Sequence, residues 1–109
     1  MDAVVAEVSG EVAGFHLLEK SSVDGEGQLA MLFVDQPFIG CGLGRVLLED
    51  AVVSAMARGW SVLRIDADPG AEAFYLRMGA RRVGEVASSA IPGRDLPLLE
   101  LGCSTSLVD

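Results

Sequence analysis

Gly40-Cys41-Gly42-Leu43-Gly44 lies between an apolar stretch, residues 29–34, and a second apolar stretch that starts at Arg45. The first stretch is typical of a strand, and the periodicity of the second predicts a helix over residues 45–58. Glycines in such a turn let the backbone approach a ligand closely, and the helix that follows offers unpaired N–H groups and a positive dipole end to an anion. The turn therefore predicts a phosphate or pyrophosphate site.

The size and charge of the chain limit its organisation and its partners. We expect residues 1–109 to form a single domain with one modest core. The net charge of -8 opposes attraction to nucleic acid and to anionic membranes. The two cysteines form no C-x-x-C pair, and neither a basic leader nor an apolar run of ~20 residues is present. We expect a cytoplasmic protein with free thiols and with no nucleic-acid or membrane partner.

The rest of the chain predicts a mixed α/β order of elements. Alternating apolar residues around Ser9-Gly10 predict a β-hairpin, and a third strand follows over residues 28–34. The long helix ends at Gly59, where a left-handed residue suits a helix C-terminus. The remaining expected elements are a strand, a short helix and two strands, over residues 60–67, 71–78, 81–87 and 96–101.

Two nucleotide-binding motifs also place a glycine turn after a strand, and this chain departs from both. A P-loop closes with Lys-Ser or Lys-Thr, whereas Arg45-Val46 stands here, so a P-loop is excluded. A dinucleotide fingerprint needs a third glycine, and the two possible frames put Arg45 or Leu47 there. The chain is also short for two mononucleotide halves, so a dinucleotide is disfavoured.

Two segments together resemble one family. Residues 34–48, Val-Asp-Gln-Pro-Phe-Ile-Gly-Cys-Gly-Leu-Gly-Arg-Val-Leu-Leu, resemble the acyl-CoA-binding motif of the GNAT (Gcn5-related) N-acetyltransferases. Residues 66–84 resemble the family's segment in which a short helix carries a Phe-Tyr pair. The resemblance implies an α+β fold with a mostly antiparallel central sheet. It also implies acetyl transfer from acetyl-CoA to an amine by direct attack, without a metal.

The resemblance also implies roles for particular residues. The backbone of the glycine turn and Arg45 would hold the CoA pyrophosphate, and the backbone at the end of the third strand would hold the pantetheine arm and the acyl carbonyl. Tyr75 would protonate the leaving thiolate, although a core tyrosine beside Phe74 is the alternative interpretation. The expected cofactor-binding residues are Leu32, Phe33, Val34, Ile39, Gly40, Cys41, Gly42, Leu43, Gly44, Arg45, Asp68 and Phe74.

The chain departs from the family pattern in ways that bear mainly on the acceptor. Ile39 stands where the family usually has Arg or Gln, Asp68 where Asn is frequent, and Ala80 where Phe is usual. The resemblance begins at the family's second strand, so its first strand and two helices have no counterpart here. We therefore expect a second subunit, as in a homodimer, or a partner polypeptide to complete the acceptor pocket. A CoA-binding or interaction module without catalysis is the alternative function.

The general base is left open by the sequence, because no carboxylate stands on the third strand. Glu26, His16 or an ordered water could serve, although a lone histidine on a hairpin is more often structural. Cys41 at a helix N-terminus lacks a matched base for covalent catalysis.

Four arginines lie around the glycine turn in the family arrangement. Arg45 is the expected phosphate contact, because it directly follows the turn. The other three are equally typical of a solvated surface, namely Arg77, Arg81 and Arg82.

Overall fold

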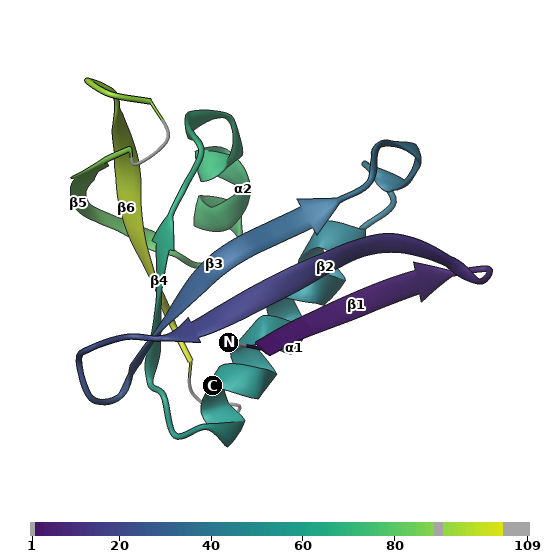
Figure 1. Ribbon diagram of the computed structural model, residues 1–109, viewed down its shortest axis with the longest axis horizontal. Helices are drawn as coiled ribbons and strands as arrows, with labels where there is room; N and C mark the ends of the chain where they lie inside the picture. The colour runs from purple at the N-terminus through teal and green to yellow at the C-terminus, as the bar shows by residue number, and fades with distance from the viewer. Residues whose placement is uncertain (1, 89–90, 104–109) are drawn as a thin grey trace.

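The computed structural model describes residues 2–88 and 91–103, which form one twisted sheet with two α-helices (Figure 1). The strands are β1 Asp2–Val8, β2 Glu11–Lys20, β3 Glu26–Val34, β4 Val62–Asp66, β5 Arg81–Ala87 and β6 Asp95–Gly102. The helices are α1 Leu43–Ala57 and α2 Glu72–Arg77, preceded by the 3-10 turns η1 Gln36–Phe38 and η2 Pro69–Ala71.

The strand order is β1-β2-β3-β4-β6-β5, and the one parallel pair among the described strands is β3 with β4. The expected α+β class with a mostly antiparallel sheet is therefore confirmed. The sequence order does not show that β6 inserts between β4 and β5, because that pairing joins distant parts of the chain.

The turns follow the glycine pattern of the sequence. Ser9 (φ 53°) and Gly10 (φ 84°) are both left-handed, as a two-residue hairpin turn requires. Gly59 (φ 80°) follows α1, as expected. The fourth strand is shorter than expected at both ends. At its start, the Trp60 N–H donates to the Ala55 carbonyl and so belongs to the end of α1. The short helix is also shorter by one residue at each end, since Ala71 belongs to η2 and Met78 is the C-cap.

The ladder between β3 and β4 is short and ends inside the sheet. It runs from Glu26 paired with Val62 to Leu29 paired with Ile65, and β3 then continues to Val34 without a β4 partner. The two strands therefore part beyond Leu29, and the gap between them faces the connection that leads into α1.

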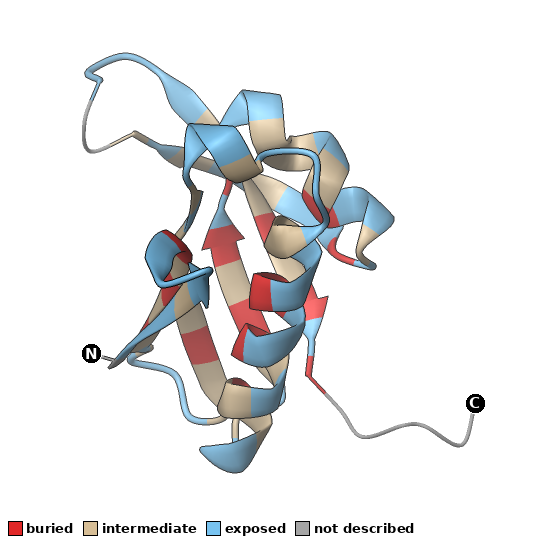
Figure 2. Cartoon of the chain, turned by 90° about the vertical axis from the view of Figure 1, so that its right-hand side faces the viewer, coloured by how far each residue is buried: buried red, intermediate tan, exposed pale blue. Residues whose placement is uncertain are grey.

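One face of the sheet is covered by α1, and the other is open. Leu48 and Ala51 of α1 pack against Leu29, Leu63 and other buried strand residues, and Figure 2 shows this buried layer between helix and sheet. The helix comes so close to β2 that a Cβ on Gly14 would lie 3.0 Å from the Leu47 Cδ1 and clash with the Phe33 carbonyl.

The opposite face of β1, β2 and β3 carries exposed apolar side chains. Val5 is 52% exposed, Met31 50% and Phe33 46%. The Phe33 ring lies 5.6 Å from the ring of Phe15 on β2. Figure 1 looks onto this face, with α1 behind the strands.

Candidate functional site

A cleft of about 460 Å³ lies where β3 and β4 part, on the α1 side of the sheet. Its walls come from the end of β3, the glycine turn, the start of α1 and the region of α2. It is lined by Leu32, Val34, Phe38, Ile39, Gly40, Gly42, Gly44, Arg45, Ala71, Phe74, Tyr75 and Arg77. A second hollow of about 510 Å³ adjoins it and shares Arg45, Phe74 and Arg77.

The glycine turn presents the uncapped start of α1 to this cleft. Gly40 (φ 89°) and Gly42 (φ 86°) are left-handed, a conformation that favours glycine. The N-cap is Gly42, so no side chain accepts a hydrogen bond from the first N–H groups, and the first helical turn carries no acidic residue. The first N–H groups of a helix have no intrahelical partner, so those of Leu43, Gly44 and Arg45 and the positive helix end are available to an anion.

Phe74 closes the cleft against the helix start. A Cβ on Gly44 would lie 3.5 Å from the Phe74 Cζ and 3.8 Å from the Val34 Cγ2. These are ordinary contact distances, so the lack of a side chain at Gly44 keeps the cleft open rather than relieving a clash. The approach of a ligand to the α1 backbone depends on this position.

Two arginines line the cleft from different helices. Arg45 is largely exposed and its Nε donates to the Glu49 Oε2 at 3.3 Å, one helical turn on. Arg77, at the end of α2, is exposed and lines both hollows. Guanidinium groups at an opening this close to a helix N-terminus suit phosphate groups.

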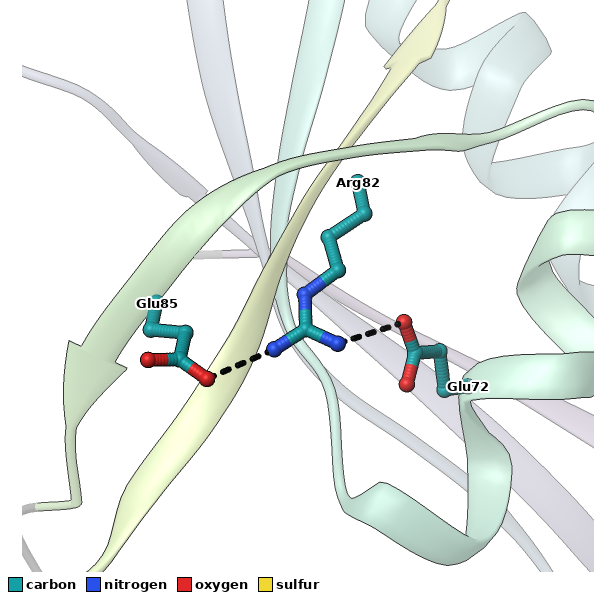
Figure 3. A network of polar contacts seen from close by, with 3 residues as sticks. All are labelled: Glu72, Arg82 and Glu85. Atoms are coloured by element: carbon teal, nitrogen blue, oxygen red, sulfur yellow. Dashed lines mark hydrogen bonds and ion pairs between the residues drawn. The ribbon is translucent and has the colours of Figure 1, made fainter.

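The other two arginines have structural partners. Arg82 on β5 bridges Glu72 at the start of α2 (3.5 Å) and Glu85 (2.7 Å), as Figure 3 shows. Arg81 pairs with Glu100 on β6 at 3.6 Å. Arg82 therefore ties α2 to β5 and helps hold the helix that carries Phe74 and Tyr75.

Tyr75 lies at the inner wall of the cleft. It is 7% exposed, packs in the main apolar cluster and meets the Phe74 ring edge-on at 5.2 Å. Burial raises the pKa of its hydroxyl to about 12, so the group stays protonated at neutral pH. Tyr75 is thus a core residue and a cleft residue at once, and the two interpretations of the sequence are compatible.

Four of the residues expected to bind the donor do not line the cleft. The Phe33 side chain points to the opposite face, and Leu43 lies at the helix start without lining the cleft. The Cys41 N–H and Sγ both donate to the Phe38 carbonyl, at 3.4 and 2.7 Å. Asp68 caps η2, where its Oδ2 accepts from the Gly70 N–H at 3.2 Å.

Phe38 and Ala71 line the cleft and were not singled out from the sequence. The sequence gives little indication that either residue lines a site, because each belongs to a short 3-10 turn that follows a strand. Only the folded connection brings these turns next to the glycine turn and α2.

Neither side-chain candidate for the base lies in the cleft. His16 is fully buried against α1, where its Nε2 lies 2.8 Å from the Asp50 Oδ2 and its Nδ1 has no hydrogen-bond partner. Glu26 accepts from the Ser21 hydroxyl at 2.7 Å, at the end of β3 remote from the cleft.

Three further features of the described residues concern metal ligands, the two cysteines and membrane-spanning helices. No cluster of three His, Cys, Asp or Glu side chains in residues 2–88 and 91–103 is placed to hold a metal ion. Cys41 is exposed and Cys103 buried, and both are free thiols. No helix in this part of the chain is both long enough and apolar enough to cross a membrane.

The chain was compared with models of known families, with curated proteins and with solved structures. The family model described as "Acetyltransferase (GNAT) domain" matches residues 1–90, so the chain belongs to the GNAT acetyltransferases. No curated protein matches.

Three similar solved structures show the same fold. A protein assigned to the GNAT family from Desulfovibrio desulfuricans has a TM-score of 0.82 at 21% identity, over 94% of this chain and 69% of its own. An IAA acetyltransferase from Bacillus cereus has a TM-score of 0.77 at 23% identity, over 92% and 76%. An aminoglycoside 6'-N-acetyltransferase complexed with coenzyme A has a TM-score of 0.81 at 16% identity, over 94% and 72%. At these identities the likeness shows the fold alone.

Proposed function

We propose that this chain transfers an acetyl group from acetyl-CoA to an amine by direct attack. The observation that carries the proposal is the cleft in which the uncapped start of α1, two arginines and Tyr75 meet, in a chain of the GNAT family. An acetyltransferase that binds a pyrophosphate-bearing thioester needs an anion site, a slot for the arm and a proton donor near the sulfur.

The donor would lie along the cleft from its cationic opening to its buried end. The N–H groups at the start of α1 would hold the pyrophosphate, with Arg45 and Arg77 beside it. The pantetheine arm would follow β3 past Leu29, where the strand has no β4 partner and its backbone groups can bond a ligand instead. Leu32, Val34 and Phe74 would contact the apolar parts of the arm.

The reaction would take place beside Tyr75. The amine nitrogen attacks the thioester carbonyl carbon, a C–N bond forms, and the C–S bond breaks with its electron pair leaving on sulfur. The Tyr75 hydroxyl then supplies a proton to the thiolate, and its burial keeps it protonated until that step. The amine gives up its proton to water, since His16 and Glu26 do not line the cleft, and the Tyr75 oxygen then takes a proton back from water. We place this reaction in the cytoplasm.

Two measurements test the proposal. Calorimetry should show acetyl-CoA binding, and a thiol-release assay over a panel of primary amines should show turnover. Binding without turnover on any amine would favour a CoA-binding module, and a failure to bind would contradict both functions.

One observation favours a role for a second chain. Val5, Met31 and Phe33 expose apolar surface on the uncovered face of β1–β3, and a face of this kind is typical of an interaction site. A homodimer in which a second copy adds to the acceptor side is the form we propose. Light scattering should then show a dimer, whereas a monomer with full activity on a small amine would contradict it.

A further inference from the structure

A separate cavity of about 590 Å³ lies on the face of the sheet away from α1, where β3 and β4 part. Its floor includes Glu19, Gln28 and Arg64, which are direct neighbours across β2, β3 and β4. These residues alternate along their strands with Leu29 and Ile65, which are buried against α1. Because successive side chains of a strand point to opposite faces, the cavity and the donor cleft open on opposite sides of the same gap.

Within residues 2–88 and 91–103, the Arg64 side chain in this cavity has no hydrogen-bond or ion-pair partner. Its Nε is buried without a hydrogen bond, and no ion pair joins its guanidinium to another described residue. Its cross-strand neighbour on β6, Glu100, pairs with Arg81 instead. Leaving the Nε donor buried and unpaired is unfavourable, and a planar anion in the cavity can accept two hydrogen bonds from a guanidinium that lines it.

Charges of both signs surround this arginine. Asp66 lies two residues further along β4, on the same face, and is exposed at the end of the ladder beside the gap. Glu19 and Lys20 complete the charged wall. The cavity therefore offers a cationic group for an anion and, nearer the gap, a carboxylate for a cation.

We propose that this cavity binds amine acceptors that also carry a carboxylate, in the manner of amino acids. The acceptor carboxylate pairs with Arg64, and its ammonium group lies at Asp66, next to the gap through which the thioester is reached. A zwitterion fits this pattern better than a simple alkyl amine, which would leave Arg64 unpaired. This inference rests on the proposed acetyl transfer, because it names the acceptor class of that reaction.

The test compares amines that differ only in the carboxylate. β-Alanine and 4-aminobutanoate are titrated by NMR against their carboxamides, β-alaninamide and 4-aminobutanamide, on the protein saturated with CoA. A charge-assisted pair with arginine predicts roughly tenfold to hundredfold tighter binding of at least one carboxylate than of its amide. In Arg64→Gln the ratio should fall to about one, and in Arg64→Lys it should be intermediate.

The control is Arg94→Gln, which removes the same charge from an exposed arginine that does not line the cavity. It should keep the wild-type ratio. Arg64→Lys keeps the positive charge, so it tests the inference even if Arg64→Gln fails to fold. Binding of CoA shows whether each variant is folded. Equal binding of carboxylate and amide, no binding of either, or a ratio that neither Arg64 variant changes would overturn the inference. Acetyl transfer is measured separately, so carboxylate-selective binding without transfer would contradict the proposed function and support only the carboxylate site at Arg64.

Discussion

The two faces of the sheet differ in how completely they are built. The face toward α1 has a continuous buried layer, with Leu48 and Leu63 fully enclosed, and it ends in the donor cleft. The opposite face of β1–β3 exposes Met31 and Phe33, and the cavity beside it is lined by Arg64, whose buried Nε has no hydrogen-bond partner among the described residues. The cleft proposed for the donor is therefore shaped by packing within this chain, whereas the cavity proposed for the acceptor is distinguished by its charged side chains.

The largest expected effect is on the free energy of unfolding, which should fall much more for a substitution on the covered face than for one on the open face. Leu48→Ala removes a fully buried side chain and should cost about 2–5 kcal/mol of the free energy of unfolding. Met31→Ala, on the open face, should cost roughly 0.5 kcal/mol or less at protein concentrations low enough for the chain to be monomeric, because half of that side chain is exposed in the single chain. Urea denaturation measures both. Similar losses would show that the open face is packed as tightly as the covered one.

The next effect concerns the chemical step at the cleft. Tyr75→Phe should lower the rate of acetyl transfer by roughly tenfold to a thousandfold with acetyl-CoA binding nearly unchanged, because only the proton donor is lost. Single-turnover kinetics with calorimetry separate the two quantities. An unchanged rate would exclude Tyr75 as the acid.

A smaller effect distinguishes ligand approach from backbone strain. Gly44→Ala should weaken acetyl-CoA binding by about tenfold while leaving the fold at least as stable, since alanine suits a helix and its Cβ meets only ordinary contacts. Gly84→Ala on β5 is the matched control, because a Cβ there meets nothing within 4 Å and lies outside the cleft. Equal affinities for the two variants would place the pyrophosphate away from the helix start.

The smallest effect appears only at alkaline pH. Burial raises the pKa of Tyr75 from 10.0 to about 12 and that of the Cys103 thiol from 9.0 to about 11. Both groups favour the folded state while protonated, so this stability is complete below pH 9 and is lost as pH rises through about 11 and 12. Urea midpoints between pH 8 and pH 12 should fall less steeply for Tyr75→Phe, with the Cys103 part of the slope retained. An identical slope would contradict this assignment.

Local patterns in the sequence were enough to predict most elements. Ser9-Gly10 marked the hairpin, Gly59 marked the end of α1, and the glycine turn and Phe74-Tyr75 converge on one cleft. These features are local because turn conformation and helix ends depend on neighbouring residues.

Features that depend on distant strands could not be predicted. The insertion of β6 between β4 and β5 leaves no local signal, and neither does the pairing of His16 with Asp50 across 34 residues. Whether Phe33 and Arg64 face the helix or the open side depends on strand register, which pairing across the sheet determines.

The short parallel ladder of β3 and β4 has a geometric consequence. Four residue pairs, Glu26 with Val62 through Leu29 with Ile65, join the two halves of the sheet directly, and α1 spans the junction from one side only. The two halves of the sheet are therefore joined by a narrow strip of backbone pairing, and the open end of the gap lies beyond Leu29. A donor on the α1 face and an acceptor on the opposite face would therefore meet only in this gap, because direct attack requires the amine to contact the thioester.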